Sequence, residues 1–338
     1  MVSLVNRSRR IIMQNIEPIP AAKSKPKQSR AFIKVVEIWV PTVNRKKLIM
    51  VDGLFDGYES FEAYSQNRSF AYGEGLPGIA WSTSRPQSIS NIAYSFFRRK
   101  EEAIKAGLGA GIAIPIFAGE FLQAVIVLLY GEEEHHSGAI ELWGKQKKFD
   151  TALSLIDGYY GSLKTFEWVS KQLTFKKGTG LPGSVWQTNM PLIFPDLRNC
   201  SSFIRKDNVK EAGITTGFGI PLRNNLGEDY VLTLLSTVGS PIAHRFEIWI
   251  PDKERQNLVL LSSHNESNNN LANKSGINLV KSGKGIMEMV WMTGCPAISH
   301  NLLEDGLIEK SESPNLKSAL VMPINEDGKL KALVNMFF

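Results

Sequence analysis

Hydrophobic and turn-forming positions recur three times along the chain at a fixed interval. Three segments align without gaps, GEGLPGIAW (73–81), GTGLPGSVW (178–186) and GKGIMEMVW (283–291), and their tryptophans Trp81, Trp186 and Trp291 stand 105 residues apart. An upstream segment, VEIWVP, IELWGK or FEIWIP, marks a shared first strand. Downstream pairs such as GIAIPI and AVIVLLY mark the last two strands. The pattern predicts one structural unit in three copies.

The second copy shows the order of elements within a unit. AIELWGK and FDTALSLID are rich in β-branched, aromatic and apolar residues, which predicts two adjacent antiparallel strands. The glycines of the GTG step allow a tight turn, Pro182 suits the first turn of a short helix, and Pro191 ends that helix. LIFPDL then predicts a short strand, FIRKDNVKEAG a second helix that stops at Gly213, and the final apolar runs a hairpin.

The run AVIVLLY is apolar at every position. A strand with one solvated face should alternate, whereas a continuous apolar run indicates burial on both faces. We therefore expect neighbouring copies, or a second chain in a homodimer, to cover the outer face of each sheet.

This order of elements, and above all the GTGLPGSVW segment followed by KEAG and GFGIPL, resembles the GAF domain family. The resemblance implies an α+β fold of three tandem GAF-like domains, each a central antiparallel β-sheet with short covering helices. The expected parts are a disordered basic tail over residues 1–30 and domains over residues 31–133, 138–236 and 241–338. The third copy is degenerate, because IME replaces LPG and the AG after its second helix is missing.

The formal net charge of +6 comes from the first 30 residues, which hold seven basic residues and one acid, Glu17. The rest of the chain holds 32 basic and 32 acidic residues, so it lacks the positive field that binding to nucleic acid requires. The basic start is a disordered tail or an organelle transit peptide. No apolar stretch is long enough to span a bilayer, which predicts a soluble, cytoplasmic protein without a membrane partner.

Members of the GAF family bind small molecules between the sheet and its covering helices, and many only mediate contacts. The resemblance therefore implies a non-catalytic sensory or regulatory protein that binds a small molecule and signals through a partner protein. A protein–protein interaction scaffold without a ligand is the alternative. One enzymatic branch reduces free methionine sulfoxide with clustered cysteines, but Cys200 and Cys295 stand at non-equivalent positions of different copies, which makes this activity the least favoured.

The sequence does not identify the ligand or a cofactor. Cys200 is followed by Ser201 and not by the histidine typical of bilin-binding members, and the residue set of the cyclic-nucleotide binders is not found. Neither cysteine has a partner at metal-ligand spacing, and the pair His135 and His136 stands in an acidic linker, so we expect no metal.

Four candidate ligand-binding residues lie on the helices that border the expected pocket. Arg99 and Arg205 each stand eight residues before the glycine that ends the second helix, where a guanidinium could pair with a carboxylate or phosphate of a ligand. A solvated charge is the alternative for both. Trp81 and Trp186 lie on the first helix, either as core residues or as part of the pocket wall.

The second copy is the best binding candidate, because Asp196 and Arg198 add polar groups near the same pocket mouth. In the third copy, His300 and Glu304 stand at helical spacing, as a ligand-contacting pair or as solvated neighbours. We expect the third copy to be structural.

Overall fold

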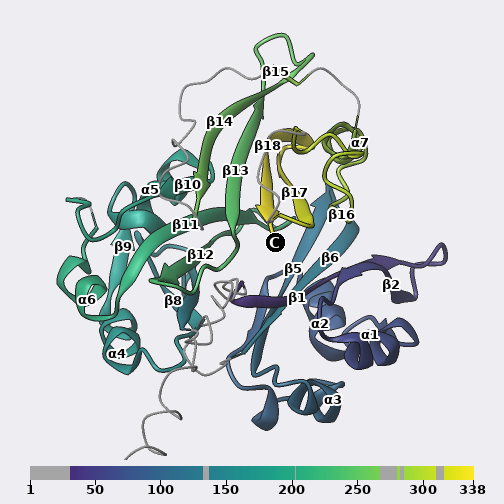
Figure 1. Ribbon diagram of the computed structural model, residues 1–338, viewed down its shortest axis with the longest axis horizontal. Helices are drawn as coiled ribbons and strands as arrows, with labels where there is room; N and C mark the ends of the chain where they lie inside the picture. The colour runs from purple at the N-terminus through teal and green to yellow at the C-terminus, as the bar shows by residue number, and fades with distance from the viewer. Residues whose placement is uncertain (1–30, 132–136, 202, 267–279, 282–284, 310–315) are drawn as a thin grey trace, which may run out of the picture.

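The computed structural model describes residues 31–338 except 132–136, 202, 267–279, 282–284 and 310–315. The predicted tail over residues 1–30 and the pair His135 and His136 therefore lie outside the described residues. The chain forms three six-stranded antiparallel sheets arranged around a common centre (Figure 1). None of the helices within the described ranges is long and apolar enough to cross a membrane.

Each sheet has the same strand order, with the first strand of its unit between the second and the last. The first sheet runs β3-β2-β1-β6-β5-β4, and the other two repeat this order with their own strands. The first unit consists of β1 (Ile33–Pro41), β2 (Lys47–Leu54), α1 (Glu59–Gln66), β3 (Ser69–Ala71), α2 (Gly75–Thr83), β4 (Gln87–Ile89), the 3-10 helix η1 (Ile92–Tyr94), α3 (Lys100–Lys105), β5 (Ala110–Ala118) and β6 (Phe121–Tyr130).

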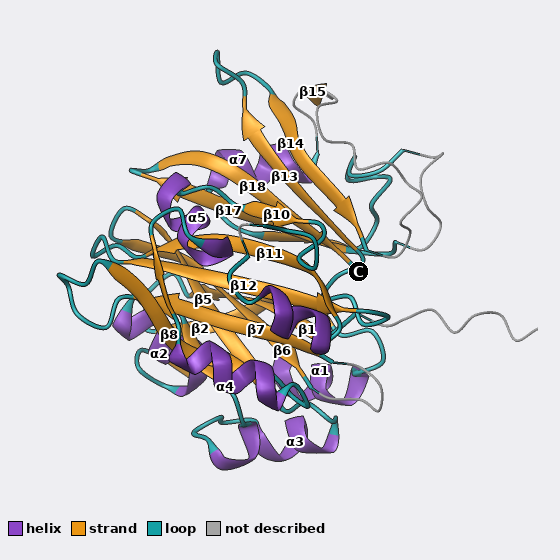
Figure 2. Cartoon of the chain, turned by 90° about the vertical axis from the view of Figure 1, so that its left-hand side faces the viewer, coloured by secondary structure: helices purple, strands orange, loops and turns teal. Residues whose placement is uncertain are grey.

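The second and third units follow the same plan (Figure 2). The second unit consists of β7 (Gly138–Gly144), β8 (Ala152–Tyr159), α4 (Lys164–Gln172), β9 (Thr174–Lys176), α5 (Gly180–Thr188), β10 (Leu192–Phe194), α6 (Lys206–Glu211), β11 (Ile214–Arg223) and β12 (Asp229–Thr237). The third unit consists of β13 (Arg245–Pro251), β14 (Leu258–Asn265), β15 (Val280–Lys281), α7 (Ile286–Thr293), β16 (Ala297–Ser299), β17 (Ala319–Glu326) and β18 (Lys329–Phe337).

The elements predicted for the second copy are all present, and the structure adds a helix that the sequence pattern did not indicate. This helix, α1 in the first unit and α4 in the second, lies between the second strand and the glycine turn. Of its side chains only Phe61 and Ser65 are buried in α1, and only Phe166 and Ser170 in α4. Two buried positions in two turns are too few to produce a recognisable helical period.

The glycine turn has the same conformation in the first two units. Gly75 and Gly180 both have φ +60, a region that favours glycine. A Cβ at Gly78 would lie 2.2 Å from the carbonyl oxygen of Ala71, so the helix packs against the preceding strand as only glycine permits. Glu288 stands at the equivalent position of the third unit, which therefore cannot have the same close approach.

The outer faces of all three sheets pack against one another in a shared central core. Ile126 on β6, Leu232 on β12 and Val334 on β18 belong to this one cluster of buried residues. The neighbouring residues Val125 and Val127 point to the other face and belong to the first unit's own core. The expectation that neighbouring copies cover the apolar strands is thus confirmed.

The three units contact each other head to tail in a closed ring. β4 contacts β8, β10 contacts β14, and β16 contacts β2, so the same short strand of each unit meets the second strand of the next. The equivalent prolines Pro115, Pro221 and Pro323 line one hollow of about 50 Å³. The units are therefore related by an approximate three-fold axis that passes near these prolines.

Polar contacts follow the same head-to-tail rule. The loop after α2 reaches the hairpin of the second unit through Arg85 and Glu228, whose nitrogen and oxygen atoms are 2.5 Å apart. The corresponding loop of the second unit reaches the third through Asn189 Nδ2, 2.7 Å from Glu326 Oε1. The Arg85–Glu228 pair is partly exposed at the rim, so the apolar core stabilises the ring more than this pair does.

We predict that Phe246→Ala lowers the free energy of unfolding by about 3–5 kcal/mol. Phe246 on β13 is buried, and its ring centroid lies 4.6 Å from that of Phe218 in the second unit. Urea denaturation measures the change, and Phe149→Ala, at a position 89% exposed, is the control with no expected effect. An unchanged midpoint for Phe246→Ala would show that the units do not depend on their shared core.

A buried carboxyl group links the second and third units. Ser236 Oγ on β12 donates a hydrogen bond to Glu266 Oε1 at 2.7 Å, just after β14. Burial raises the pKa of Glu266 to about 8, although the Ser236 hydrogen bond acts in the opposite direction. Glu266 therefore keeps its proton in the folded protein at pH values where it would lose it in the unfolded chain.

Because the folded-state pKa is raised, Glu266 should favour folding below about pH 4.5 and cost stability as the pH rises toward about 8. We predict that Glu266→Gln flattens the fall of the unfolding free energy over this range, by at most about 1.4 kcal/mol per pH unit. Urea titrations at several pH values measure it, with the exposed Glu254→Gln as control. Parallel profiles for wild type and Glu266→Gln would contradict the prediction.

Candidate functional site

The space between sheet and helices in the first unit is occupied by a buried ion pair. Arg99, at the start of α3, directs both terminal nitrogens to the carboxylate of Glu37 on β1, with Nη2 2.8 Å from Oε2. Trp39 Nε1 donates to the same carboxylate at 2.9 Å, and Arg99 Nη1 donates to Ser65 Oγ on α1 at 2.6 Å. Arg99 is 1% exposed and Glu37 is 0% exposed.

The second unit repeats this arrangement with the equivalent residues. Arg205 Nη2 lies 2.9 Å from Glu141 Oε2, and Arg205 Nη1 donates to Ser170 Oγ at 2.6 Å. Trp143 Nε1 donates to Glu141 at 3.1 Å. The repetition shows that the interior of both units is organised by one network that joins the first strand to two helices.

Electrostatics in the second unit favour the ionised carboxylate. Burial by itself raises the pKa of Glu141, but the Arg205 guanidinium and hydrogen bonds from Thr233 and Tyr160 outweigh it and leave the pKa lowered. Thr233 Oγ1 and the Tyr160 hydroxyl donate at 2.9 and 3.0 Å. The pair is therefore charged near neutral pH.

Aromatic rings enclose both guanidinium groups. In each unit four ring centroids lie 4.4–5.7 Å from the arginine Cζ: Trp39, Phe61, Phe70 and Phe97 around Arg99, and Trp143, Phe166, Phe175 and Phe203 around Arg205. Such contacts stabilise a desolvated cation. Protein side chains thus fill the space that the family resemblance reserved for a ligand.

In the third unit the equivalent buried glutamate has different partners. Glu247 on β13 accepts a hydrogen bond from Trp249 Nε1 at 2.8 Å, but its cation is Arg245 from the same strand, and Asn335 Nδ2 lies 3.4 Å from Oε2. The glutamate is common to all three units, two residues before a strand tryptophan. This glutamate was not among the predicted site residues, although the repeated E-x-W in VEIWVP, IELWGK and FEIWIP indicates it, since residues i and i+2 of a strand share a face.

The other predicted site residues lie apart from these networks. Trp186 is 7% exposed and packs in the core of its unit, with Nε1 3.2 Å from Asp229 Oδ2, while Trp81 packs edge-on against Tyr72. Asp196 and Arg198 form an exposed turn in which Arg198 Nε is 3.4 Å from Asp196 Oδ1. The structure therefore does not gather these residues with Arg205 into one pocket.

The expected helical pair in the third unit is wrong. His300 follows β16 directly and Glu304 lies in a run of turns, because this segment forms no α-helix. His300 Nε2 instead lies 2.9 Å from Asp52 Oδ1 on β2 of the first unit. The histidine thus belongs to the junction between the third and first units.

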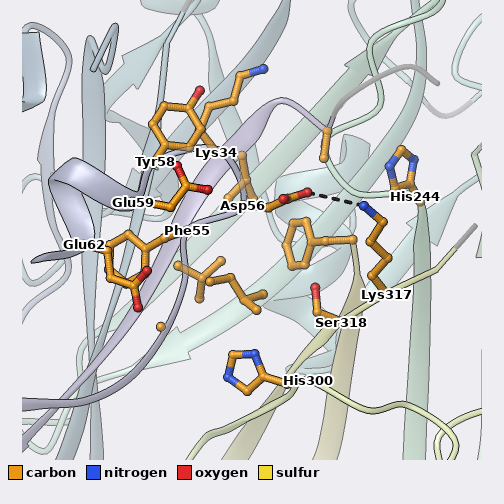
Figure 3. A pocket seen from close by; sticks show the side chains of 16 residues that line it. Lys34, Phe55, Asp56, Tyr58, Glu59, Glu62, His244, His300, Lys317 and Ser318 are labelled. Atoms are coloured by element: carbon orange, nitrogen blue, oxygen red, sulfur yellow. Dashed lines mark ion pairs between the residues drawn. The ribbon is translucent and has the colours of Figure 1, made fainter. Parts of the chain in front are cut away.

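A cleft lies at this junction between the third and first units. It has a volume of about 650 Å³, and Figure 3 shows Glu59, Glu62 and Lys34 on the side of the first unit and Lys317, His244 and His300 on the side of the third. Its lining from the first unit includes Lys34, Leu54, Phe55, Asp56, Tyr58, Glu59 and Glu62, and its lining from the third consists of His244, His300, Lys317, Ser318 and Phe338. We call it the junction cleft.

At the equivalent junction between the first and second units, the inner part is filled by side chains. Tyr159 stands where the first unit has Leu54, and Tyr130 stands where the third has Phe338. These tyrosines pack at a centroid distance of 5.3 Å, and Phe32 stacks on Tyr130 at 5.8 Å. The inner space there is only about 10 Å³, beside an outer groove of about 470 Å³. The open inner space of the junction cleft is thus not imposed by the repeated fold.

We predict that Arg99→Met lowers the free energy of unfolding by about 3–5 kcal/mol, because it leaves the buried Glu37 carboxylate without its cation. Chemical denaturation measures this loss. The adjacent Arg98, whose side chain is 64% exposed, provides a matched control, and Arg98→Met should change stability by less than about 1 kcal/mol. Equal effects of the two substitutions would mean that the buried pair does not hold the first unit together.

Comparisons with known proteins give fold-level similarity only. No protein-family model and no curated protein matches the chain. It is similar to the solved GAF domain of A. aeolicus nlh2, with 20% identity over 29% of this chain and 57% of that one and a TM-score of 0.24. The GAF domain of a Coxiella burnetii phosphoenolpyruvate-protein phosphotransferase matches with 15% identity over 30% and 58% of the two chains and a TM-score of 0.26.

The second GAF domain of DevS from Mycobacterium smegmatis matches with 16% identity over 30% of this chain and 62% of that one, and a TM-score of 0.23. This chain thus spans less than two thirds of each of these solved chains. The repeated glycine turn, the strand order and the helices between the strands are those expected from the resemblance to GAF domains.

Proposed function

We propose that the chain is a non-catalytic regulatory protein of three tandem GAF-like domains, over residues 31–133, 138–236 and 241–338, that binds a small molecule at the junction cleft and signals through a partner protein. The observation that carries the proposal is the contrast between filled and open spaces. The buried pairs Arg99–Glu37 and Arg205–Glu141 fill the domain interiors, whereas the junction cleft stays open.

The size and lining of the junction cleft support a small-molecule site. Its volume of about 650 Å³ is within the roughly 300–1,000 Å³ range of small-molecule pockets. It combines an apolar floor with a few polar groups on either side, and it lies between two domains, where ligand sites are common. Binding at such a junction would couple a ligand to the contact between the first and third domains.

A scaffold without a ligand is the second candidate, favoured by the occupied interiors of the first two units. If the arginines only stabilise the fold, a partner protein could recognise the outer surface without any small molecule. The reductase alternative receives little support, since burial raises the pKa of the Cys295 thiol and so disfavours the reactive thiolate.

A thermal-shift screen of a metabolite library distinguishes these candidates. A ligand at a hundredfold excess over its Kd stabilises the folded state by about 2.7 kcal/mol, which raises the melting temperature. We predict that at least one metabolite raises the melting temperature of the wild type and not that of Leu54→Tyr. This substitution places a tyrosine in the cleft, as Tyr159 stands at the equivalent position of the second unit. Val51→Tyr, on the same strand but 54% exposed and outside the cleft, is the control.

A ligand that stabilises Leu54→Tyr and wild type equally would place the site elsewhere. A library without any stabilising metabolite would favour the scaffold. Reduction of free methionine sulfoxide that is lost in Cys200→Ser or Cys295→Ser would overturn the non-catalytic assignment.

A further inference from the structure

We propose that the ligand of the junction cleft is a small zwitterion, with an amine at one end and an acid group at the other, of the amino-acid class. This inference rests on the proposed function and adds the charge and polarity of the ligand. It follows from the distribution of charge, because the wall from the first unit carries three carboxylates against one lysine, Lys34, whereas the wall from the third unit carries Lys317 (Figure 3).

The wall from the first unit is acidic on balance, with Asp56, Glu59 and Glu62 against the single lysine Lys34. Glu59 and Glu62 stand three residues apart on α1, so they lie on one face of the helix. Glu59 accepts a hydrogen bond from the backbone nitrogen of Gly57 at 3.2 Å, and Glu62 accepts one from Gln66 at 2.9 Å. Neither forms an ion pair with a cation of the described residues, so both can accept hydrogen bonds from an ammonium group.

The equivalent helix of the second unit, α4, does not have this negative charge, so the charge is specific to the first unit. Lys164 replaces Glu59 at the equivalent position of α4. Glu167, the counterpart of Glu62, is paired with Lys164 at 3.4 Å and with Lys171 at 2.7 Å. The second unit thus neutralises this helix face with its own lysines, whereas the first unit leaves its carboxylates facing the cleft.

The opposite wall provides one cation, Lys317, for an acid group. Lys317 lies at the rim, with its ammonium 3.7 Å from the carboxylate of Asp56, and both side chains are largely exposed. A pair so exposed is weak, so a carboxylate of a ligand can compete for the Lys317 ammonium. His300 lies on the same side, next to Asp52. Burial lowers the pKa of His244, which favours the uncharged form of its imidazole at this wall.

Apolar residues lie between the two walls. Leu54, Phe55 and Phe338 line this part of the cleft. A ligand that spans it would place its amine at Glu59 and Glu62, its acid group at Lys317, and an apolar body over the floor. A purely anionic molecule would meet the unpaired carboxylates, and a purely cationic one would leave Lys317 without a new partner.

Isothermal titration calorimetry of the full chain tests the assignment. The probes are the twenty L-amino acids at millimolar concentration and, for each that binds, its analogue without the amine and its analogue without the carboxylate. We expect at least one amino acid to bind. The affinity of each of its two analogues should be lower by about tenfold or more, since each analogue lacks one hydrogen-bonded charge.

Two variants assign the ends of the ligand. Glu59→Gln with Glu62→Gln should weaken the amino acid about tenfold and leave its amine-free analogue unchanged. Lys317→Met should weaken binding of the amino acid about tenfold and leave binding of its carboxylate-free analogue unchanged. Glu101→Gln with Glu102→Gln on α3, and the exposed Lys329→Met, make the same charge changes away from the cleft and should have no effect.

The zwitterion assignment is overturned if no amino acid binds, or if binding is unchanged in the Glu59 and Glu62 double variant. Its failure differs from failure of the proposed function. A metabolite of another charge class whose binding is lost in Leu54→Tyr would refute the zwitterion and leave the regulatory function in place. If no metabolite is lost in Leu54→Tyr, both are overturned.

Discussion

The shared core between the three sheets is the constraint on which the rest of the structure depends. Each sheet is apolar on both faces, and its helices cover only one of them. The outer faces must therefore be buried against other sheets, because exposed apolar strands would be unstable in water. Three copies in one chain meet this requirement by closing into a ring, in which the outer face of each sheet is buried against the other sheets.

Because the ring closes, the junction cleft, which we propose as the ligand site, lies between two units and not within one of them. Inside the first two units, the glutamate of the first strand recruits an arginine from the second helical segment, and aromatic rings surround the pair. A buried ion pair of this kind need not add much net stability, but removal of either partner leaves a charge that water cannot reach. It therefore constrains the position of the helices on the sheet more than it contributes net free energy.

Because the units are repeated, equivalent positions within the chain can be compared with one another. The junctions share backbone geometry, and they differ at a few side chains. Tyr159 and Leu54 occupy equivalent positions, and so do Lys164 and Glu59. Differences on an otherwise constant scaffold indicate where the units have diverged in role. The third unit, which we expected to be only structural, contributes one wall of the junction cleft.

The sequence by itself determined the repeat, the order of strands and helices, the glycine turns and the burial of AVIVLLY on both faces, since these follow from local periodicity and from residues with special backbone freedom. It did not reveal α1 and α4, whose two buried positions leave no period. Only the tertiary structure decided that Arg99 and Arg205 are interior residues, because their partners Glu37 and Glu141 are more than sixty positions away in the chain. The same holds for the junction cleft: His300 and Asp52 become neighbours only because the ring closes, and local sequence patterns carry no information about such contacts.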